Sequence, residues 1–184
     1  KTIQELEQVF GCPVIESYGM TEAAHQMASN PINGIRKSGS VGKAAGPKIA
    51  LLKNSKIVSE IGIEGEIIIK GKNVTLGYKN NETANKESFF DGWFKTGDLG
   101  TFDDEGFLFI SGRIKEIINK GGEKISPKEI DEALIQHPGV FQAVSFSVPH
   151  EKLGEDIGAA IVLKDNSSVS KKELQLYLNG IISD

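Results

Sequence analysis

The stretch from Gly92 to Pro127, GWFKTGDLGTFDDEGFLFISGRIKEIINKGGEKISP, decides how this chain is organised. It places polar residues and glycines at short intervals between segments that are typical of strands. The sequence DDEG at residues 103–106 predicts a turn that joins two strands, and the ends of this hairpin are expected to meet near Asp98 and Arg113. Neither a buried strand nor an ordinary surface loop requires these polar residues. We therefore expect a ligand at the start of the stretch and a hinge in its middle.

Composition and charge are those of an ordinary globular protein. The chain has 184 residues, enough for one domain of average size or for parts of two. Acidic and basic residues are interspersed and the net charge is −4, so no basic block indicates a nucleic acid or an anionic membrane as partner. The apolar runs are far too short to span a bilayer. The sequence therefore predicts neither kind of partner, and it carries no signal for an oligomeric state.

Two further features concern the cellular location and the ends of the chain. The single cysteine, Cys12, has no partner for an internal disulfide, which suits a reducing compartment. The chain starts with Lys1 rather than methionine and shows no signal peptide, so we expect a fragment or a processed chain. We expect a cytoplasmic location, with a peroxisomal one as the alternative.

The first part of the chain predicts a helix, a strand and a functional turn. Residues 2–10 predict a short amphipathic helix, and residues 12–17, CPVIES, predict a buried strand. The strand runs into YGMTE, which places the Thr21 hydroxyl and the Glu22 carboxylate at its carboxyl end, where open α/β sheets bind ligands. A plain turn with Thr21 as a helix cap is an equally good interpretation.

The middle of the chain is typical of β-structure. Residues 48–52 and 56–60 predict strands that flank a polar turn, and the β-branched run at residues 65–71 predicts another strand. Residues 81–88 predict one or two helical turns.

After Lys115 the order β-α-β-β-α predicts a small α+β unit. Residues 126–129, SPKE, predict a helix start with Ser126 as the cap, and Ser170 with Glu173 predicts a capping box for the last helix. The predicted fold class is therefore α/β and α+β, with a β-rich unit followed by a small α+β domain and a boundary at residues 112–115.

Asp98 and Arg113 are candidates for binding a nucleotide sugar. Asp98 is expected in a turn, where its carboxylate can accept hydrogen bonds from both vicinal hydroxyls of a ribose. Charge-assisted bonds of this kind contribute roughly 1.5–3 kcal/mol each. Arg113 can reach the same sugar or a phosphate with its planar guanidinium. The alternatives are an aspartate that satisfies its own turn and an arginine in a weak surface ion pair.

Thr21, Glu22 and His25 are candidates for a phosphate and substrate site. Thr21 can donate to a phosphate oxygen, and Glu22 can bind Mg²⁺, which prefers carboxylate oxygens. His25 follows Glu22 by three residues, and an imidazole there can bind an anionic substrate. The alternatives are a solvated carboxylate at a helix start and a histidine on a helix surface.

The Gly121-Gly122 pair lets the backbone approach a ligand closely, because neither residue has a Cβ. A plain β-turn is the better interpretation of this pair alone. The sequence contains neither a Walker A motif nor a Gly-x-Gly-x-x-Gly motif after a strand, so ordinary P-loop and Rossmann sites are not predicted. The three histidines show no pattern of a metal site.

Four motifs together resemble the adenylate-forming superfamily, which includes acyl-CoA synthetases, luciferases and peptide-synthetase adenylation domains. They occur in the family's order over nearly the whole chain. The four are Tyr18-Gly19-Met20-Thr21-Glu22, the segment from Gly65-Glu66 to Gly77-Tyr78, Trp93-Phe94-Lys95-Thr96-Gly97-Asp98, and the segment from Gly112-Arg113 to Ile130. The resemblance implies that residues 1–112 are the C-terminal part of the large AMP-binding domain. Residues 113–115 are then a hinge, and residues 116–184 a small mobile domain.

The resemblance also implies an activity and roles in nucleotide binding. A carboxylate attacks ATP to give an acyl-adenylate and pyrophosphate, and CoA then takes the acyl group. By the family pattern Tyr18 lies against the adenine, Gly19 is one of the nucleotide-binding residues, and Thr21 contacts the AMP phosphate. Glu22 binds Mg²⁺, while Asp98 and Arg113 contact the ribose.

For the second half-reaction, the resemblance implies that the small domain rotates at Lys115 and that Gly121-Gly122 then lies along the CoA arm. In having a lysine at the hinge position, the chain resembles the luciferase-like and coumarate-ligase-like members of the family. Other members have an aspartate there. An acceptor on a carrier protein is the alternative to CoA.

The segment from Met20 to Pro31 resembles oxalate–CoA ligases, where a histidine in the place of His25 helps bind the small dianion. Oxalate is therefore the expected carboxylic acid. The alternatives are a medium-chain fatty acid and a 4-coumarate-like acid.

Two elements of the family pattern lie outside the sequence. The phosphate-binding loop lies upstream in the family, and the lysine that drives adenylation lies further downstream. We therefore expect a fragment, truncated before the catalytic lysine, that is inactive alone. A non-catalytic adenylate-binding protein is a further alternative, against which Thr21, Glu22, Asp98 and Arg113 argue.

Overall fold

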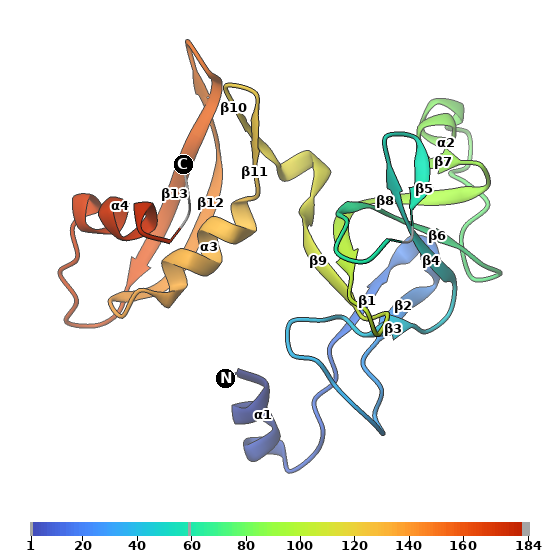
Figure 1. Cartoon of the computed structure of the whole chain (residues 1–184), viewed down its shortest axis with the longest axis horizontal. Helices are drawn as coiled ribbons and strands as arrows, with labels where there is room; N and C mark the ends of the chain where they lie inside the picture. The colour runs from blue at the N-terminus through green and yellow to red at the C-terminus, as the bar shows by residue number, and fades with distance from the viewer. Residues whose placement is uncertain (1, 59, 182–184) are drawn as a thin grey trace. The chain divides into compact units, whose positions relative to one another are not determined.

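The computed structural model describes residues 2–58 and 60–181. The chain separates into two compact units, Lys1–Ile110 and Ser111–Asp184 (Figure 1). Their mixed, β-rich content agrees with the fold class expected from the sequence. The domain limits and the hinge at residues 113–115 stay predictions. Within the described part of the chain, no helix is long and apolar enough to cross a membrane.

The first unit contains two antiparallel sheets. The smaller has the order β1-β2-β3, and the larger has the order β5-β4-β6-β8-β7 with β9 paired to β8. The strands of the smaller sheet are β1 (Ser17–Met20), β2 (His25–Ser29) and β3 (Lys43–Ala44). Those of the larger are β4 (Lys48–Lys53), β5 (Lys56–Val58), β6 (Gly65–Lys70), β7 (Phe89–Phe90), β8 (Trp93–Phe102) and β9 (Leu108–Arg113). Two helices belong to this unit: α1 (Thr2–Phe10) precedes β1 in the sequence, and α2 (Glu82–Ser88) lies between β6 and β7.

The two sheets pack on each other through a shared core. Ile67, Ile68 and Ile69 are fully buried, so both faces of β6 are covered. Met27 of β2 packs in one cluster with Ile69 and Phe94. This packing explains why a continuous β-branched run forms the central strand, as the sequence predicts.

The strand predicted at residues 12–17 is wrong, because the first strand is β1, Ser17–Met20. The preceding segment is tied to α1 instead of a sheet. The Val14 amide donates to Glu7 Oε1 at 3.0 Å, and the Val14 carbonyl accepts from Arg36 at 3.2 Å. Pro13 has no N–H for a ladder. The predicted helix at residues 2–10 is confirmed, although none of its residues is buried.

The predicted hairpin between β8 and β9 is confirmed, and Asp103 anchors its turn. The Asp103 Oδ1 atom accepts from the amides of Glu105 and Phe107 at 3.0 and 2.8 Å. Its other oxygen forms an ion pair with Lys37 at 2.5 Å. These bonds, with the Lys37 hydrogen bond the largest cause, lower the pKa of Asp103.

The second unit is an antiparallel sheet with two helices. The strand order is β11-β10-β13-β12. The elements are the 3-10 turn η2 (Ile114–Glu116), β10 (Ile118–Lys120), β11 (Glu123–Ile125), α3 (Pro127–Gln136), β12 (Val140–His150), β13 (Gly154–Leu163) and α4 (Lys171–Asn179). Ile130 and Leu134 of α3 and Leu174 of α4 share one core with Val140 and Ala143 of β12. The unit has one strand more than the predicted order, because residues 123–125 form β11.

The two predicted helix caps of this unit differ in outcome. The capping box of Ser170 and Glu173 is confirmed, with both reciprocal bonds present. The predicted helix start is confirmed, with Ser126 at the N-cap position and Pro127 as the first residue of α3, but the Ser126 side chain forms no capping hydrogen bond. Its hydroxyl donates to the Ser111 carbonyl at 2.9 Å, and this bond ties the start of α3 to the strand β9.

Candidate functional site

The YGMTE motif forms the end of β1 and a tight 3-10 turn, η1 (Thr21–Ala23). The chain reverses here into β2, and Ala24 and His25 have φ values of 50° and 82°. Gly19 is required by this geometry, because a Cβ would lie 1.8 Å from the His25 carbonyl oxygen. Thr21 is exposed and Glu22 is half-buried, so both are placed directly after the strand, as expected.

Glu22 is held through its backbone and through its side chain. Its carbonyl accepts from the Thr75 amide at 2.7 Å, and its Oε1 atom accepts from the Tyr78 hydroxyl at 2.9 Å. The pKa of Tyr78 is raised. The main cause is burial of the phenol, and the second is its hydrogen bond to Glu22. The carboxylate is therefore oriented by a residue from a distant loop.

Asp98 lies inside β8 rather than in a turn, so the predicted turn is wrong. Between Glu66–Leu99 and Ile68–Lys95 the pairing of β6 and β8 shifts register, which marks a β-bulge. Gly97 in this bulge has a φ of 77°. The Asp98 amide donates to Thr96 Oγ1 at 3.1 Å. The bulge explains the glycine of the Thr-Gly-Asp sequence, because glycine readily adopts positive φ.

The Tyr18 hydroxyl donates a hydrogen bond to the carboxylate of Asp98. The two residues are 80 positions apart in the sequence, and the bond joins β1 to β8. Asp98 is only 4% exposed. A buried carboxylate requires hydrogen bonds, and Tyr18 supplies one of them.

His25 is the exposed first residue of β2, so its placement on a helix surface, the alternative interpretation, is wrong. It follows η1 directly and lies in the same turn region as Thr21 and Glu22. The structure therefore places these three residues in one short segment, while the role of His25 in substrate binding stays a prediction.

Arg113, Lys115 and the Gly121-Gly122 pair belong to the second unit. Arg113 ends β9, Lys115 lies in η2, and both are exposed. Gly121 and Gly122 have φ values of 63° and 99° and form the two-residue turn between β10 and β11. The β-turn interpretation of this pair is thus confirmed, and its role toward CoA stays a prediction.

A single carboxylate suits magnesium that arrives with a nucleotide. Among the described residues, no group of three or more His, Cys, Asp or Glu side chains can hold a metal ion. Mg²⁺ keeps several waters and often binds through one or two carboxylates and substrate phosphates. Glu22, beside the exposed Thr21, fits this mode.

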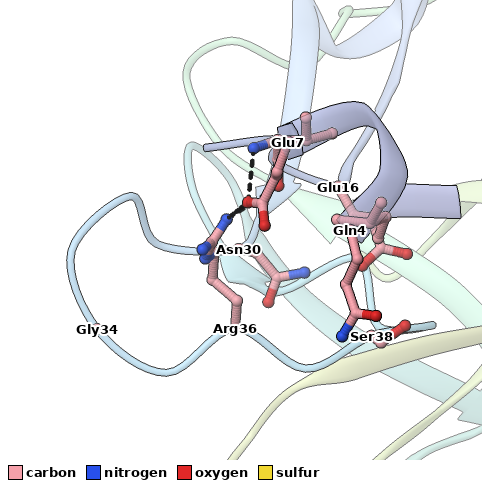
Figure 2. Close-up of a pocket in the computed structure, with 9 residues that line it drawn as sticks. Gln4, Glu7, Glu16, Asn30, Gly34, Arg36 and Ser38 are labelled. Carbon is pink, nitrogen blue, oxygen red and sulfur yellow. Dashed lines mark hydrogen bonds and ion pairs between the residues drawn. The ribbon is translucent and has the colours of Figure 1, made fainter. Parts of the chain in front are cut away.

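A pocket of about 320 Å³ lies beside α1 and contains none of the predicted site residues (Figure 2). Glu7, Glu16, Asn30 and Arg36 line part of it. The Glu7 carboxylate bonds to the Val14 amide and pairs with Arg36 at 2.5 Å. Both bonds lower the pKa of Glu7, and the bond from the Val14 amide has the larger effect. The charged groups of Glu7 and Arg36 in this pocket therefore hold α1 and the loop of residues 30–38 together.

Known protein families and relatives match this chain. The family model of AMP-binding enzymes matches residues 1–79, and the model of the C-terminal domain of AMP-binding enzymes matches residues 129–184. The chain belongs to the adenylate-forming, AMP-binding enzyme family. Oxalate–CoA ligases of Arabidopsis thaliana and Saccharomyces cerevisiae are each 49% identical to it, over 95% and 96% of the chain. The chain spans 34% and 33% of these relatives, about a third of their length.

Solved structures of this adenylate-forming family show the same fold. ATP-bound MatB from Rhodopseudomonas palustris covers 99% of the chain with a TM-score of 0.90 and 34% identity. The synthetase MenE from Bacillus subtilis, in complex with ATP and magnesium, covers 97% of the chain with a TM-score of 0.81 and 37% identity. The chain covers 37% of each of them. The predicted fold class and family are thereby confirmed.

Two residues that shape the site, Tyr78 and Asn85, are not predicted as site residues from the sequence. Tyr78 belongs to a motif and Asn85 to a predicted helix, but neither pattern points to the site. The signal in the sequence was weak, because a Gly-Tyr pair before a helical segment occurs in many loops. The hydrogen bonds from Tyr78 to Glu22 and between Asn85 and the Tyr78 backbone become visible only in the folded chain.

Proposed function

We propose that this chain is part of an ATP-dependent, AMP-forming acyl-CoA synthetase. The observation that carries the proposal is the Tyr18–Asp98 hydrogen bond, which brings two motifs far apart in the sequence together. Thr21 and Glu22 follow Tyr18 on the same segment. A hydroxyl, two carboxylates and an aromatic ring are thus gathered in one unit, as a nucleotide site requires.

In the first half-reaction, a carboxylate oxygen of the substrate attacks the α-phosphorus of ATP. The bond from this phosphorus to the bridging oxygen breaks, and pyrophosphate leaves with the electron pair. We assign Thr21 to the phosphate, Tyr18 to the adenine, and Asp98 with Arg113 to the ribose hydroxyls, with Gly19 as a further nucleotide-binding residue. Such contacts hold the nucleotide in line for attack, and positioning of this kind lowers the barrier.

Glu22 is the residue that we assign to Mg²⁺. When bound, the ion neutralises charge on the ATP phosphates. The half-buried position of Glu22 and its bond from Tyr78 keep the carboxylate in one place. The protein's contribution is therefore a fixed ligand oxygen next to the Thr21 hydroxyl.

In the second half-reaction, the CoA sulfur attacks the acyl carbon, and AMP leaves as the carbon–oxygen bond breaks. We assign Lys115 to the hinge that lets the small domain rotate between the steps. The exposed Gly121-Gly122 turn is the backbone surface along the CoA arm. An adenylation domain that loads a carrier protein is the second candidate, since the same turn could receive a phosphopantetheine arm.

Oxalate is the carboxylic acid that we propose as substrate. Two 49% identical relatives are named oxalate–CoA ligase, and a 44% identical one from Cupriavidus necator is named sulfoacetate–CoA ligase. Both named acids carry two negative charges. The exposed His25, directly after η1, can donate a hydrogen bond to the second anionic group.

The test is pyrophosphate release by the full-length protein with ATP, Mg²⁺ and a panel of carboxylates. The panel contains oxalate, a medium-chain fatty acid and 4-coumarate. We expect the highest kcat/KM with oxalate, and an acyl-CoA product when CoA is added. If none of the three acids supports pyrophosphate release, the proposed activity is contradicted. If another acid is preferred, only the proposal of oxalate as the substrate is overturned.

A further inference from the structure

The loop after β6 contacts the η1 turn through three hydrogen bonds. The Asn73 side-chain amide donates to the Ala23 carbonyl at 2.8 Å. The Thr75 amide donates to the Glu22 carbonyl at 2.7 Å, and the Tyr78 hydroxyl donates to Glu22 Oε1 at 2.9 Å. Two of these bonds fix the backbone of the turn. The third acts on the Glu22 carboxylate alone.

Tyr78 is itself held from two directions. Its amide donates to Asn85 Oδ1 at 2.6 Å, and the Asn85 side chain donates back to the Tyr78 carbonyl at 2.9 Å. Its ring lies edge-on to Phe94 with 6.5 Å between centroids. Gly77 makes the close approach of Asn85 possible, because a Cβ at this position would lie 2.8 Å from Asn85 Oδ1. The position of the Tyr78 hydroxyl is therefore set by the fold before any ligand binds.

We propose that Tyr78 is a positioning residue, which holds the Glu22 carboxylate in the orientation that binds nucleotide-borne Mg²⁺. The inference rests on the proposed function, because that function assigns Glu22 to the metal. Fixing the rotamers of a glutamate costs conformational entropy. The bond from Tyr78 transfers this cost from ligand binding to folding, and a preorganised ligand oxygen gains affinity in this way.

The geometry separates this role from a purely structural one. The backbone of η1 keeps its bonds from Asn73 and Thr75 when the Tyr78 hydroxyl is removed. The ring contact with Phe94 and the clamp by Asn85 also remain in a phenylalanine variant. The hydroxyl loses its bond to Glu22 Oε1 and its hydrogen bond with Ser88, the last residue of α2, and only the first of these acts on the proposed metal ligand.

The test measures ATP binding to the full-length protein by calorimetry, once with Mg²⁺ and once with EDTA, and without a carboxylate substrate. The ratio of the two affinities is the gain that the metal provides. We expect Tyr78→Phe to reduce this gain roughly ten-fold, as loss of a hydrogen bond to a charged group predicts, with unchanged affinity in EDTA. Glu22→Gln should reduce it at least as much, and the double variant should match Glu22→Gln.

Tyr177→Phe is the matched control, because Tyr177 lies in α4 of the other unit and contacts His137. It should leave the gain unchanged. An unchanged gain in Tyr78→Phe, or an equal loss of affinity in EDTA, would overturn the positioning role. The role would also be overturned if Mg²⁺ raised the ATP affinity of the double variant clearly less than that of Glu22→Gln. Pyrophosphate release by the wild-type protein tests the proposed function separately, because it asks whether the reaction occurs at all and not how Glu22 is oriented.

Discussion

The proposed nucleotide site and the proposed CoA-facing turn are built in opposite ways. The first joins distant residues through side-chain bonds, from Tyr18 to Asp98 and from Tyr78 to Glu22. The turn at Gly121-Gly122 is exposed and is held by bonds of its backbone amides to Leu153 and Asn119. We propose from this difference that the first region positions a ligand in advance, while the second offers exposed backbone to a partner.

The largest effect is expected for Asp98→Ala in the full-length protein. Loss of two charge-assisted bonds to the ribose corresponds to about 3 kcal/mol or more, so the KM for ATP should rise at least 100-fold. Asp104→Ala, in the exposed turn of the same hairpin, is the control and should leave the KM unchanged. Steady-state pyrophosphate release measures both variants, and an unchanged KM in Asp98→Ala would remove Asp98 from the ribose role.

A second prediction separates the two half-reactions. Lys115→Pro restricts the backbone at the proposed hinge, since proline fixes φ. Pyrophosphate formation in a single turnover should stay within about two-fold of the wild type, while thioester formation should fall at least ten-fold. Rapid-quench measurements of acyl-AMP and acyl-CoA give both rates. Equal loss of both would count against the hinge.

A smaller effect is expected for the CoA-facing turn. Gly122 has a φ of 99° and no atom within 4 Å of an added Cβ, so Gly122→Ala strains the backbone without a steric clash. We expect the KM for CoA to rise a few-fold, in line with roughly 1 kcal/mol of backbone strain, and the KM for ATP to stay the same. Gly106→Ala has the same kind of strain in the β8–β9 turn and is the matched control. A similar KM for CoA in both variants would contradict the assignment.

The smallest effect concerns the Lys37–Asp103 ion pair that anchors the β8–β9 turn. Because the pKa of Asp103 is lowered in the folded state, its contribution to stability is present above about pH 4 and is lost as the pH falls through the lowered pKa. The pair is partly exposed, so Lys37→Met should lower the Tm at pH 7 by only about 1–3 °C, and less at pH 3. Thermal unfolding at both pH values checks this, and an equal shift at both would contradict the ion-pair account.

Local patterns predicted most of the fold. The strand at residues 65–71, the turn at residues 103–106 and the Ser170–Glu173 capping box depend on neighbours in sequence, and all three are confirmed. The strand expected at residues 12–17 is wrong, because its amide and carbonyl groups bond to Glu7 and Arg36 instead of another strand. Long-range partners of this kind leave no periodic pattern in the sequence.

The candidate site shows the same limit. Thr21 and Glu22 were placed correctly after a strand, since a strand–turn pattern is local. Asp98 was expected in a turn, but it lies in a bulge of β8, which exists only because β6 pairs alongside. The bond from Tyr78 to Glu22 spans 56 residues, and no spacing rule relates the two positions.

The most direct test of the central claim is a crystal structure of the full-length protein with ATP and Mg²⁺. We predict ribose hydroxyls within about 3 Å of the Asp98 carboxylate and a phosphate at the Thr21 hydroxyl. A nucleotide bound elsewhere, for example in the pocket beside Arg36, with Asp98 still bonded to Tyr18 and away from any ligand, would contradict the claim.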